Sequence, residues 1–218
     1  MDAPPLQLTA RGPVLGHPSG VPALANLFRE QQVIKLPGFI APPLLSWIHG
    51  QVAAASWFER QHEGLAATEL SMHDNTCLGL LHFLVNDPVV LRFVEQVVSH
   101  QPLTAFNGRV YHRMPGRHRD DWHDDLHPDR QVGLSVNLSA GVYEGGVFEL
   151  RLADGERPLG AMANVGFGDA ILFAIADHLQ HRVSPLGGTV AKTAFAGWFG
   201  GTRDYNRTLR SDPTLADP

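Results

Sequence analysis

The sequence has little cysteine, little lysine and no long apolar run. Cys77 is the one cysteine, which excludes an intrachain disulfide and leaves structural zinc without its preferred thiolate ligands. Only Lys35 and Lys192 are lysines and the net charge is -5, so we expect neither a nucleic-acid partner nor an anionic membrane surface. No stretch has the length of a membrane span, and residues 1–20 lack a signal-peptide pattern. These absences predict a cytoplasmic protein.

The chain contains 218 residues, 44% of them hydrophobic, which is enough to bury a substantial core. Residues 1–20 are rich in proline and are expected to form a flexible N-terminal arm. Apolar residues at helical spacing predict helices over about 21–30, over 42–56 and from 88 onward. We expect one domain over 21–200, with helical support over 21–100 and a β-rich core over 103–200. A polar tail is expected over 201–218.

Short strand patterns alternate with turn signals in the second half of the chain. In one of them, Val132, Leu134 and Val136 alternate with small or polar residues, which predicts a strand with one apolar face. Short strands at this spacing favour a β-sandwich or barrel. The strands are expected over 108–113, 122–125, 132–138, 147–152, 170–175, 181–184 and 189–199.

Two histidines and one aspartate form a candidate metal site. His123 and Asp125 are two residues apart, so an extended strand over 122–125 would place both side chains on one face. His181, from a later strand, would add a second imidazole. Two imidazoles and one carboxylate suit Fe(II) and leave coordination positions open for substrates. His178 is the other histidine nearby, and we expect it in the preceding loop or beside a ligand.

Lys192 begins a strand in which Ala194, Ala196 and Trp198 have the same parity. Taken alone, such a lysine is more often a surface residue. Beside a metal, the small residues leave room for an anionic co-substrate whose charge the ammonium group would balance.

These motifs together resemble the Fe(II)- and 2-oxoglutarate-dependent oxygenases, in particular the prolyl 4-hydroxylase-like branch. The resemblance covers about 80 residues and rests on WHDDL (122–126), YEGGVFEL (143–150), GFGDAILF (166–173), HRVSPL (181–186) and KTAFAGWF (192–199). It implies a mainly β fold with a helical buttress, a double-stranded β-helix (jelly roll) whose N-terminal helices pack on one sheet.

The resemblance also implies an enzyme, a dioxygenase that hydroxylates an unactivated C–H bond and releases succinate and CO2. Fe(II) would be bound by His123, Asp125 and His181, and 2-oxoglutarate by Lys192, with O2 as the oxidant and ascorbate as a candidate reductant. Tyr111 or Arg113 would also contact 2-oxoglutarate. Catalysis would therefore depend on the three metal ligands and on Lys192.

Two other classes are compatible with parts of this pattern. A cupin-like metal enzyme that does not use 2-oxoglutarate usually has His-x-His, and Lys192 would then be unexplained. A non-catalytic jelly-roll ligand-binding protein would bind no iron.

The substrate class stays open between a peptide or protein side chain, an amino acid and a small natural product. Residues 59–80 are a candidate lid over the site. Five arginines surround the metal motif in sequence, and they indicate either a solvated loop or an anionic substrate: Arg109, Arg113, Arg117, Arg119 and Arg130.

Overall fold

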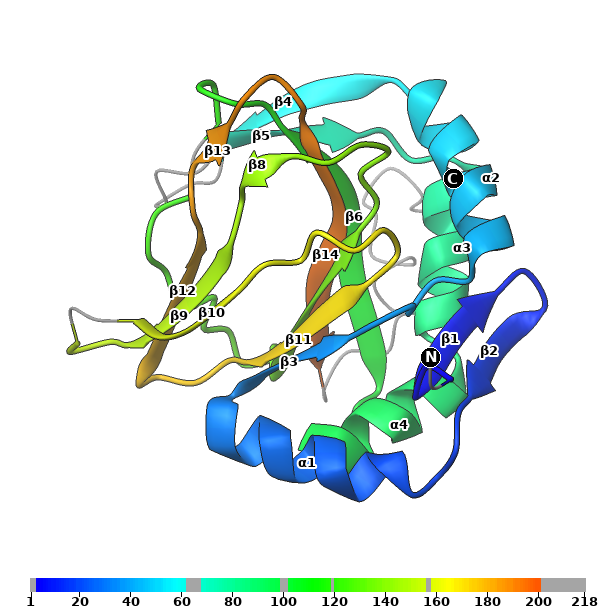
Figure 1. Cartoon of the computed structure of the whole chain (residues 1–218), viewed down its shortest axis with the longest axis vertical. Helices are drawn as coiled ribbons and strands as arrows, with labels where there is room; N and C mark the ends of the chain where they lie inside the picture. Colours follow the sequence, from blue (N-terminus) through cyan, green and yellow to red (C-terminus); the bar gives the residue numbers. More distant parts are fainter. Residues whose placement is uncertain (1–2, 62–67, 99–101, 119, 156–157, 201–218) are drawn as a thin grey trace, which may run out of the picture.

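The computed structural model describes residues 3–61, 68–98, 102–118, 120–155 and 158–200 (Figure 1). Its largest element is a seven-stranded antiparallel sheet in the order β3-β11-β7-β14-β6-β5-β4. These strands are β3 (Val33–Leu36), β4 (Trp57–Gln61), β5 (Thr68–Met72), β6 (Ala105–Arg113), β7 (Val132–Asn137), β11 (Ala170–Ala174) and β14 (Lys192–Gly200).

A smaller antiparallel sheet faces the large one, in the order β10-β9-β12. Its strands are β9 (Phe148–Leu152), β10 (Pro158–Met162) and β12 (Leu179–Val183). Two further strand pairs are β1 (Leu6–Thr9) with β2 (Gly12–Leu15), and β8 (Glu144–Gly145) with β13 (Leu186–Gly187). Phe148 and Leu150 of β9 pack against Ile171 and Phe173 of β11, so a buried apolar cluster joins the two sheets.

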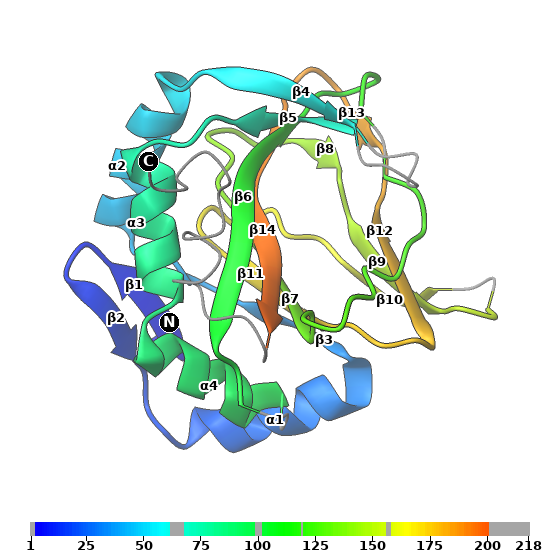
Figure 2. The same cartoon turned by 180° about the vertical axis from the view of Figure 1, so that it is seen from behind.

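In the described part of the chain, four helices lie on the side of the large sheet away from β9, β10 and β12 (Figure 2). They are α1 (Gly20–Gln31), α2 (Pro42–Ala53), α3 (Thr76–Val85) and α4 (Pro88–Val98). Pro42 and Pro43 begin α2, and the Asn75 side chain accepts a hydrogen bond from the Leu78 N–H at the start of α3. In the described residues, no single helix is long and apolar enough to span a membrane, whereas α3 and α4 pass that test only as a pair bent by 55°.

Strand alternation gives the large sheet two chemically different faces. Val132, Leu134 and Val136 of β7 and Phe195 and Phe199 of β14 belong to the same buried cluster as the helix side chains. The alternate residues face the smaller sheet instead. On β14 these include Lys192, which is paired in register with Arg113 of β6, while Ala194 is paired with Tyr111 and Ala196 with Arg109. The inner face is therefore polar and cationic along β6 and β14, whereas along β11 it is apolar.

The lower part of the β6 edge, beyond its pairing with β5, is covered by side chains from α3 and its C-terminal end. Asn86 accepts a hydrogen bond from the Phe106 N–H and donates one to the Phe106 carbonyl. The His82 ring nitrogen Nε2 lies 2.8 Å from the Gly108 carbonyl oxygen. These backbone groups are satisfied without a further strand.

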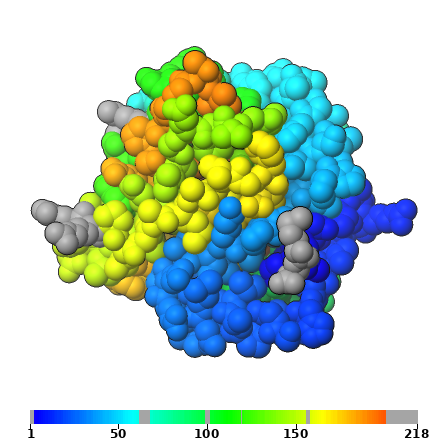
Figure 3. All heavy atoms as spheres, viewed as in Figure 1, coloured from blue at the N-terminus to red at the C-terminus, as the bar shows by residue number. Residues whose placement is uncertain are grey.

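The expectation of a loose arm over residues 1–20 is wrong for the part that forms β1 and β2. Leu6 and Leu8 are fully buried and belong to the main apolar cluster, and the Leu8 N–H donates to the Phe39 carbonyl. The space-filling view shows the blue N-terminal segments directly below the yellow segment that precedes β11 (Figure 3). The prediction gave weight to the four prolines and overlooked the short alternation of apolar and polar residues in Leu6-Gln7-Leu8, which is typical of a half-buried strand.

The structure contradicts two further expectations, and a third concerns residues outside its described part. Residues 122–125 do not form a strand, since only His123 makes a β-bridge. The candidate lid over 59–80 includes the start of α3, where Cys77 is fully buried, so that part is core and cannot be a lid. The tail predicted over 201–218 lies outside the described residues.

The buried N-terminal hairpin gives a first prediction. Leu8→Ala should lower the free energy of unfolding by roughly 2–5 kcal/mol, because it leaves a cavity in the core. Leu15→Ala, at a position that is 53% exposed on the neighbouring strand, should change it by no more than about 0.5 kcal/mol. Urea unfolding of the two variants measures the difference, and equal effects would contradict the hairpin's place in the core.

Candidate metal centre and adjoining cavity

Backbone pairing brings the two candidate histidine ligands together. The His123 N–H donates to the His181 carbonyl at 3.0 Å, and the His181 N–H donates to the His123 carbonyl at 2.8 Å. Residues that exchange both bonds across an antiparallel pair project their side chains to the same side. The two imidazole centroids lie 4.3 Å apart as a result. The 122–128 loop is therefore held on β12 by a single two-residue bridge.

Asp125 reaches the same point through an unusual backbone conformation rather than through strand parity. Its φ is 59°, in the left-handed region that aspartate tolerates better than most residues. Asp125 Oδ2 lies 3.3 Å from His181 Nε2 and 3.8 Å from His123 Nε2. One ligand atom from each of the three residues lies within 4.8 Å of the others, and this is the one such group in the described part of the chain.

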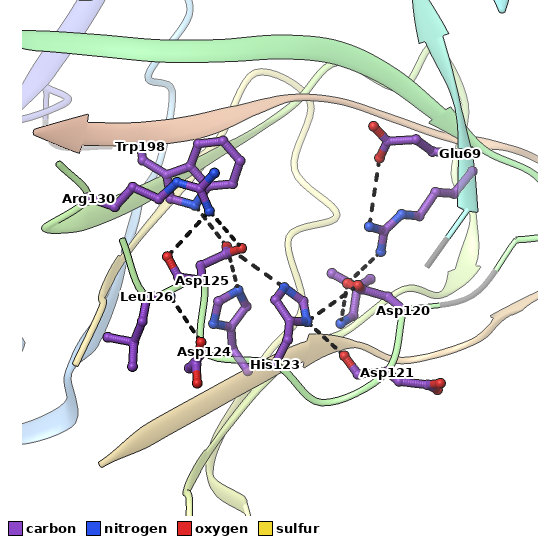
Figure 4. A network of polar contacts seen from close by, with 12 residues as sticks. Glu69, Asp120, Asp121, His123, Asp124, Asp125, Leu126, Arg130 and Trp198 are labelled. Atoms are coloured by element: carbon purple, nitrogen blue, oxygen red, sulfur yellow. Dashed lines mark hydrogen bonds and ion pairs between the residues drawn. The ribbon is translucent and has the colours of Figure 1, made fainter. Parts of the chain in front are cut away.

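Two neighbouring side chains orient the Asp125 carboxylate. The Trp198 indole N–H donates to Asp125 Oδ2 at 2.8 Å, and an Arg130 guanidinium nitrogen lies 3.4 Å from Oδ1. The Arg130 guanidinium also stacks over the Trp198 ring, 3.7 Å from its centroid. Figure 4 shows Arg130 and Trp198 together on one side of Asp125, with His123 on the other.

The protonation states of the three residues favour metal binding. His123 Nδ1 lies 2.7 Å from the Asp121 carbonyl oxygen, which can only accept, so Nδ1 donates its N–H there and Nε2 is the ring nitrogen nearer to Asp125. Burial lowers the pKa of His181. Burial raises the pKa of Asp125, but the hydrogen bond and charge of His181, the charge of His123 and the Trp198 N–H outweigh it, and the pKa falls to about 2. The group thus offers an ionised carboxylate beside two imidazoles, and burial disfavours the charged form of His181.

Asp120 fixes the loop that carries His123. Its Oδ2 lies 2.6 Å from an Arg113 guanidinium nitrogen and accepts the Val183 N–H at 3.0 Å, and its Oδ1 lies 3.7 Å from His123 Nδ1. Burial raises the pKa of Asp120, yet the nearby positive charge of Arg113 brings it below its usual value. This carboxylate therefore connects β6 and β12 to the loop of the first histidine (Figure 4).

A cavity of about 510 Å³ begins at these three residues and extends between the two sheets. Lys192 lines it, is 2% exposed and donates from Nζ to the Gly146 carbonyl at 2.8 Å. Burial lowers the pKa of Lys192 to about 7, with a further decrease from the charge of Arg113. Tyr111 also lines the cavity, and burial raises its pKa to about 12, so its hydroxyl keeps a proton to donate.

The structure places the remaining predicted residues as follows. Arg113 lines the cavity, but its guanidinium is paired with Asp120, so its main contact is with the protein. His178 is exposed in a turn beside Asp177 and lies outside the metal group. The expectation that His178 lies in the loop before His181 is confirmed. The alternative, that it lies beside a ligand of the metal group, is wrong.

Sequence reasoning did not assign three residues around the metal group: Asp120, Arg130 and Trp198. Asp120 stands in the acidic run before His123, Arg130 is one of the five arginines and Trp198 shares the parity of Lys192. These positions indicated proximity to the site. The contact of Trp198 with Asp125 joins residues that are distant along the chain, whereas Arg130 and Asp120 lie close in sequence to the residues they contact, Asp125 and His123.

No protein-family model and no curated protein sequence matches this chain. Solved structures do match it. A 2-oxoglutarate–Fe(II) oxygenase-family oxidoreductase from Burkholderia pseudomallei is 16% identical, with a TM-score of 0.63, over 84% of this chain and 92% of that one. A prolyl-4-hydroxylase from Pseudomonas putida is 17% identical, with a TM-score of 0.64, over 84% and 100%.

Two further matches broaden the group. A prolyl hydroxylase from Trichoplax adhaerens, solved with a peptide fragment of hypoxia inducible factor, is 12% identical, with a TM-score of 0.64, over 88% of this chain and 93% of that one. The α-ketoglutarate-dependent epimerase SnoN of nogalamycin biosynthesis is 15% identical, with a TM-score of 0.65, over 93% of each chain. At these identities the likeness establishes the fold: the chain has the jelly-roll fold of 2-oxoglutarate–Fe(II) oxygenases, as the sequence resemblance predicted.

The geometry predicts that His181, and not the neighbouring His178, contributes to metal affinity. His181→Ala should weaken binding of cobalt(II), a stable substitute for Fe(II), by more than about 100-fold, because it removes one of three ligands. His178→Ala is the matched control, three residues away and exposed, and should bind cobalt(II) like the parent protein. Titration followed by the visible absorption of cobalt(II) measures both, and equal losses would contradict the assignment.

Proposed function

We propose that this protein is an Fe(II)- and 2-oxoglutarate-dependent dioxygenase that hydroxylates an unactivated C–H bond. The observation that carries the proposal is the convergence of His123, Asp125 and His181 at a cavity whose wall includes the buried Lys192. Fold likeness to oxygenases supports the same reading. A cupin-like metal enzyme would leave a buried lysine without a function, and a non-catalytic binding protein would have no need of the metal group.

In the proposed mechanism, His123, Asp125 and His181 would hold the ferrous ion. Bound with 2-oxoglutarate and O2, the iron supplies the oxidising power to remove a hydrogen atom from C–H, while 2-oxoglutarate becomes succinate and CO2. The protein's own part is to bind and orient. Trp198 and Arg130 fix Asp125 through a hydrogen bond and an ion pair, and the Asp121 carbonyl fixes the tautomer of His123.

Lys192 and Tyr111 would bind the distal carboxylate of 2-oxoglutarate. Both line the cavity and both are buried, so a carboxylate between them would form hydrogen bonds in a site largely closed to water. The Lys192 ammonium is directed at the Gly146 carbonyl and at the Tyr143 ring, with Nζ 5.6 Å from the ring centroid. No carboxylate pairs with it in the described residues, and an incoming anion would supply that counter-charge.

The fold also serves a protein named as an epimerase. The full set of two histidines and one aspartate in this chain is compatible with hydroxylation, and the mass of the product distinguishes hydroxylation from epimerisation. Peptides and small molecules are both proposed as substrates, since one structural neighbour was solved with a peptide fragment.

Asp125→Asn tests the activity. It keeps the side-chain shape and the tolerance of a positive φ, but it removes the ligand charge, so succinate formation from 2-oxoglutarate and Fe(II) should fall by more than about 100-fold. Asp124→Asn is the matched control, because Asp124 is turned away and accepts a hydrogen bond from the Leu126 N–H. Absence of iron-dependent succinate from the parent protein would reject the proposed activity.

The buried lysine predicts a pH dependence. The pKa of Lys192 is lowered from 10.5 to about 7, so the ammonium that would bind the dianion is lost as the pH rises above that value. One lost proton makes the apparent Kd for 2-oxoglutarate increase by up to about tenfold per pH unit above that pKa, until the pH reaches the higher pKa that Lys192 would have beside the bound anion.

Lys192→Met should weaken 2-oxoglutarate binding by more than about tenfold at pH 6.5 and remove this slope. Lys35→Met, at the only other lysine, should keep both the affinity and the slope, because Lys35 pairs with Asp169 outside the cavity. Calorimetric titration of the zinc-loaded variants between about pH 6 and 9 measures this, and an unchanged slope in Lys192→Met would count against the role.

A further inference from the structure

The cavity of about 510 Å³ has an excess of positive charge. The excess remains after the carboxylates in its wall and the charges of the proposed reactants are counted. The cationic side chains that line it are Arg60, Arg109, Arg113, Arg130 and Lys192. The carboxylates that line it are Glu69, Asp120 and Asp125. On the proposed function, the ferrous ion adds two positive charges and 2-oxoglutarate removes two. About two positive charges therefore remain, in a protein whose net charge is -5.

Three of the five cations have assigned contacts. Arg113 pairs with Asp120 at 2.6 Å, Arg130 contacts Asp125 at 3.4 Å and stacks on Trp198, and Lys192 binds the Gly146 carbonyl. Within the described residues, Arg109 and Arg60 are the two arginines of this cavity that have no carboxylate oxygen within hydrogen-bond distance.

Arg109 is the better placed of these two. Its nearest carboxylate oxygen, on Glu69, lies 3.8 Å from the guanidinium nitrogen NH1, which is beyond hydrogen-bond length. NH1 is buried and has no hydrogen-bond partner within the described residues. Its guanidinium lies 5.9 Å from the centroid of the Trp198 ring. A buried N–H of a charged group is normally satisfied, so this position is suited to an anionic acceptor.

Arg60 of β4 is exposed, and within the described residues it has neither a hydrogen bond nor an ion pair. It lines the same cavity as Arg109. Both arginines, with Arg130 and Trp198, also line a second cavity of about 980 Å³, so these four side chains form the boundary between the two spaces. The second cavity also contains apolar side chains, among them Phe58, Met72 and Leu78.

We propose that this boundary is a substrate subsite, in which Arg109 and Arg60 bind a negatively charged group of the substrate, a carboxylate or a phosphate. Trp198 forms its floor and connects it to the metal group through the hydrogen bond to Asp125. The rest of the substrate extends on one side toward the metal and on the other into the larger cavity. The substrate class is thus an organic acid with an apolar portion, larger than a free amino acid.

Matched probes test the subsite without turnover. Phenylacetate, phenylacetamide and phenyl phosphate are titrated calorimetrically into the full chain loaded with zinc(II) and saturated with 2-oxoglutarate, so that Lys192 is already occupied. We expect an anionic probe to bind at least about tenfold more tightly than the neutral amide, and to weaken as salt is raised. The stronger of the two anions identifies carboxylate or phosphate.

Variants assign the preference to the two arginines. Arg109→Gln and Arg60→Gln should each weaken the favoured anionic probe by about tenfold, with a smaller loss for Arg109→Lys. Arg60 is exposed, so its variant tests the proposal even where Arg109→Gln fails to fold. Arg92→Gln, on the exposed surface of α4, is the matched control and should bind every probe like the parent protein.

The possible outcomes separate the two proposals. If the zinc-loaded parent protein does not bind 2-oxoglutarate, the proposed function fails. If 2-oxoglutarate binds but no anion binds better than phenylacetamide, or both arginine variants keep the parent's affinity, the anion subsite alone is overturned.

Discussion

The candidate centre depends on one pair of backbone hydrogen bonds, exchanged between His123 and His181. This pairing fixes the loop of the first histidine on the strand of the second, and so sets the separation of the imidazoles before any metal binds. Asp120 adds a second attachment, since its carboxylate joins Arg113 of β6 to the Val183 N–H of β12. A metal group held in this way is organised by the sheets, and it needs little reorganisation to bind an ion.

The inner face of the large sheet determines which side chains surround the cavity beyond the candidate metal group. Alternation along β6 and β14 aligns Arg109, Tyr111 and Arg113 with Ala196, Ala194 and Lys192. The alanines leave space where the neighbouring strand supplies charge and hydroxyl groups. The same alternation sends Phe195 and Phe199 to the opposite side, into the apolar cluster shared with the helices. One strand thus contributes both to the core and to the cavity, so substitutions on its two faces should have different consequences.

The sequence alone indicated the residues of the centre better than the reason for their convergence. The spacing of His123 and Asp125 suggested a strand, whereas Asp125 reaches His181 through a left-handed backbone in a loop. Parity along 192–199 correctly placed Lys192 and Trp198 on the cavity wall. Period-two alternation is a local property and can be read from a single chain. A two-residue bridge depends on distant segments and leaves no local pattern.

The same distinction explains the errors in the fold. Four prolines dominated the interpretation of residues 1–20, although Leu6 and Leu8 are fully buried next to β3 and α2. Proline is compatible with an edge hairpin, and β2 contains Pro13. The strands β4 and β5 were not predicted, because their residues alternate weakly and β4 is mostly exposed. Their contribution is visible only in three dimensions, where Arg60 and Glu69 reach the cavity.

The covered edge of β6 limits how a substrate can be recognised. Asn86 and His82 occupy the outward backbone groups of Phe106 and the carbonyl of Gly108, immediately beside the larger cavity. An extended peptide therefore cannot extend the sheet here by adding its own strand, a mode of recognition that reads main-chain atoms with little regard to side chains. Where the larger cavity meets this part of β6, it offers an extended ligand side-chain contacts in place of strand pairing.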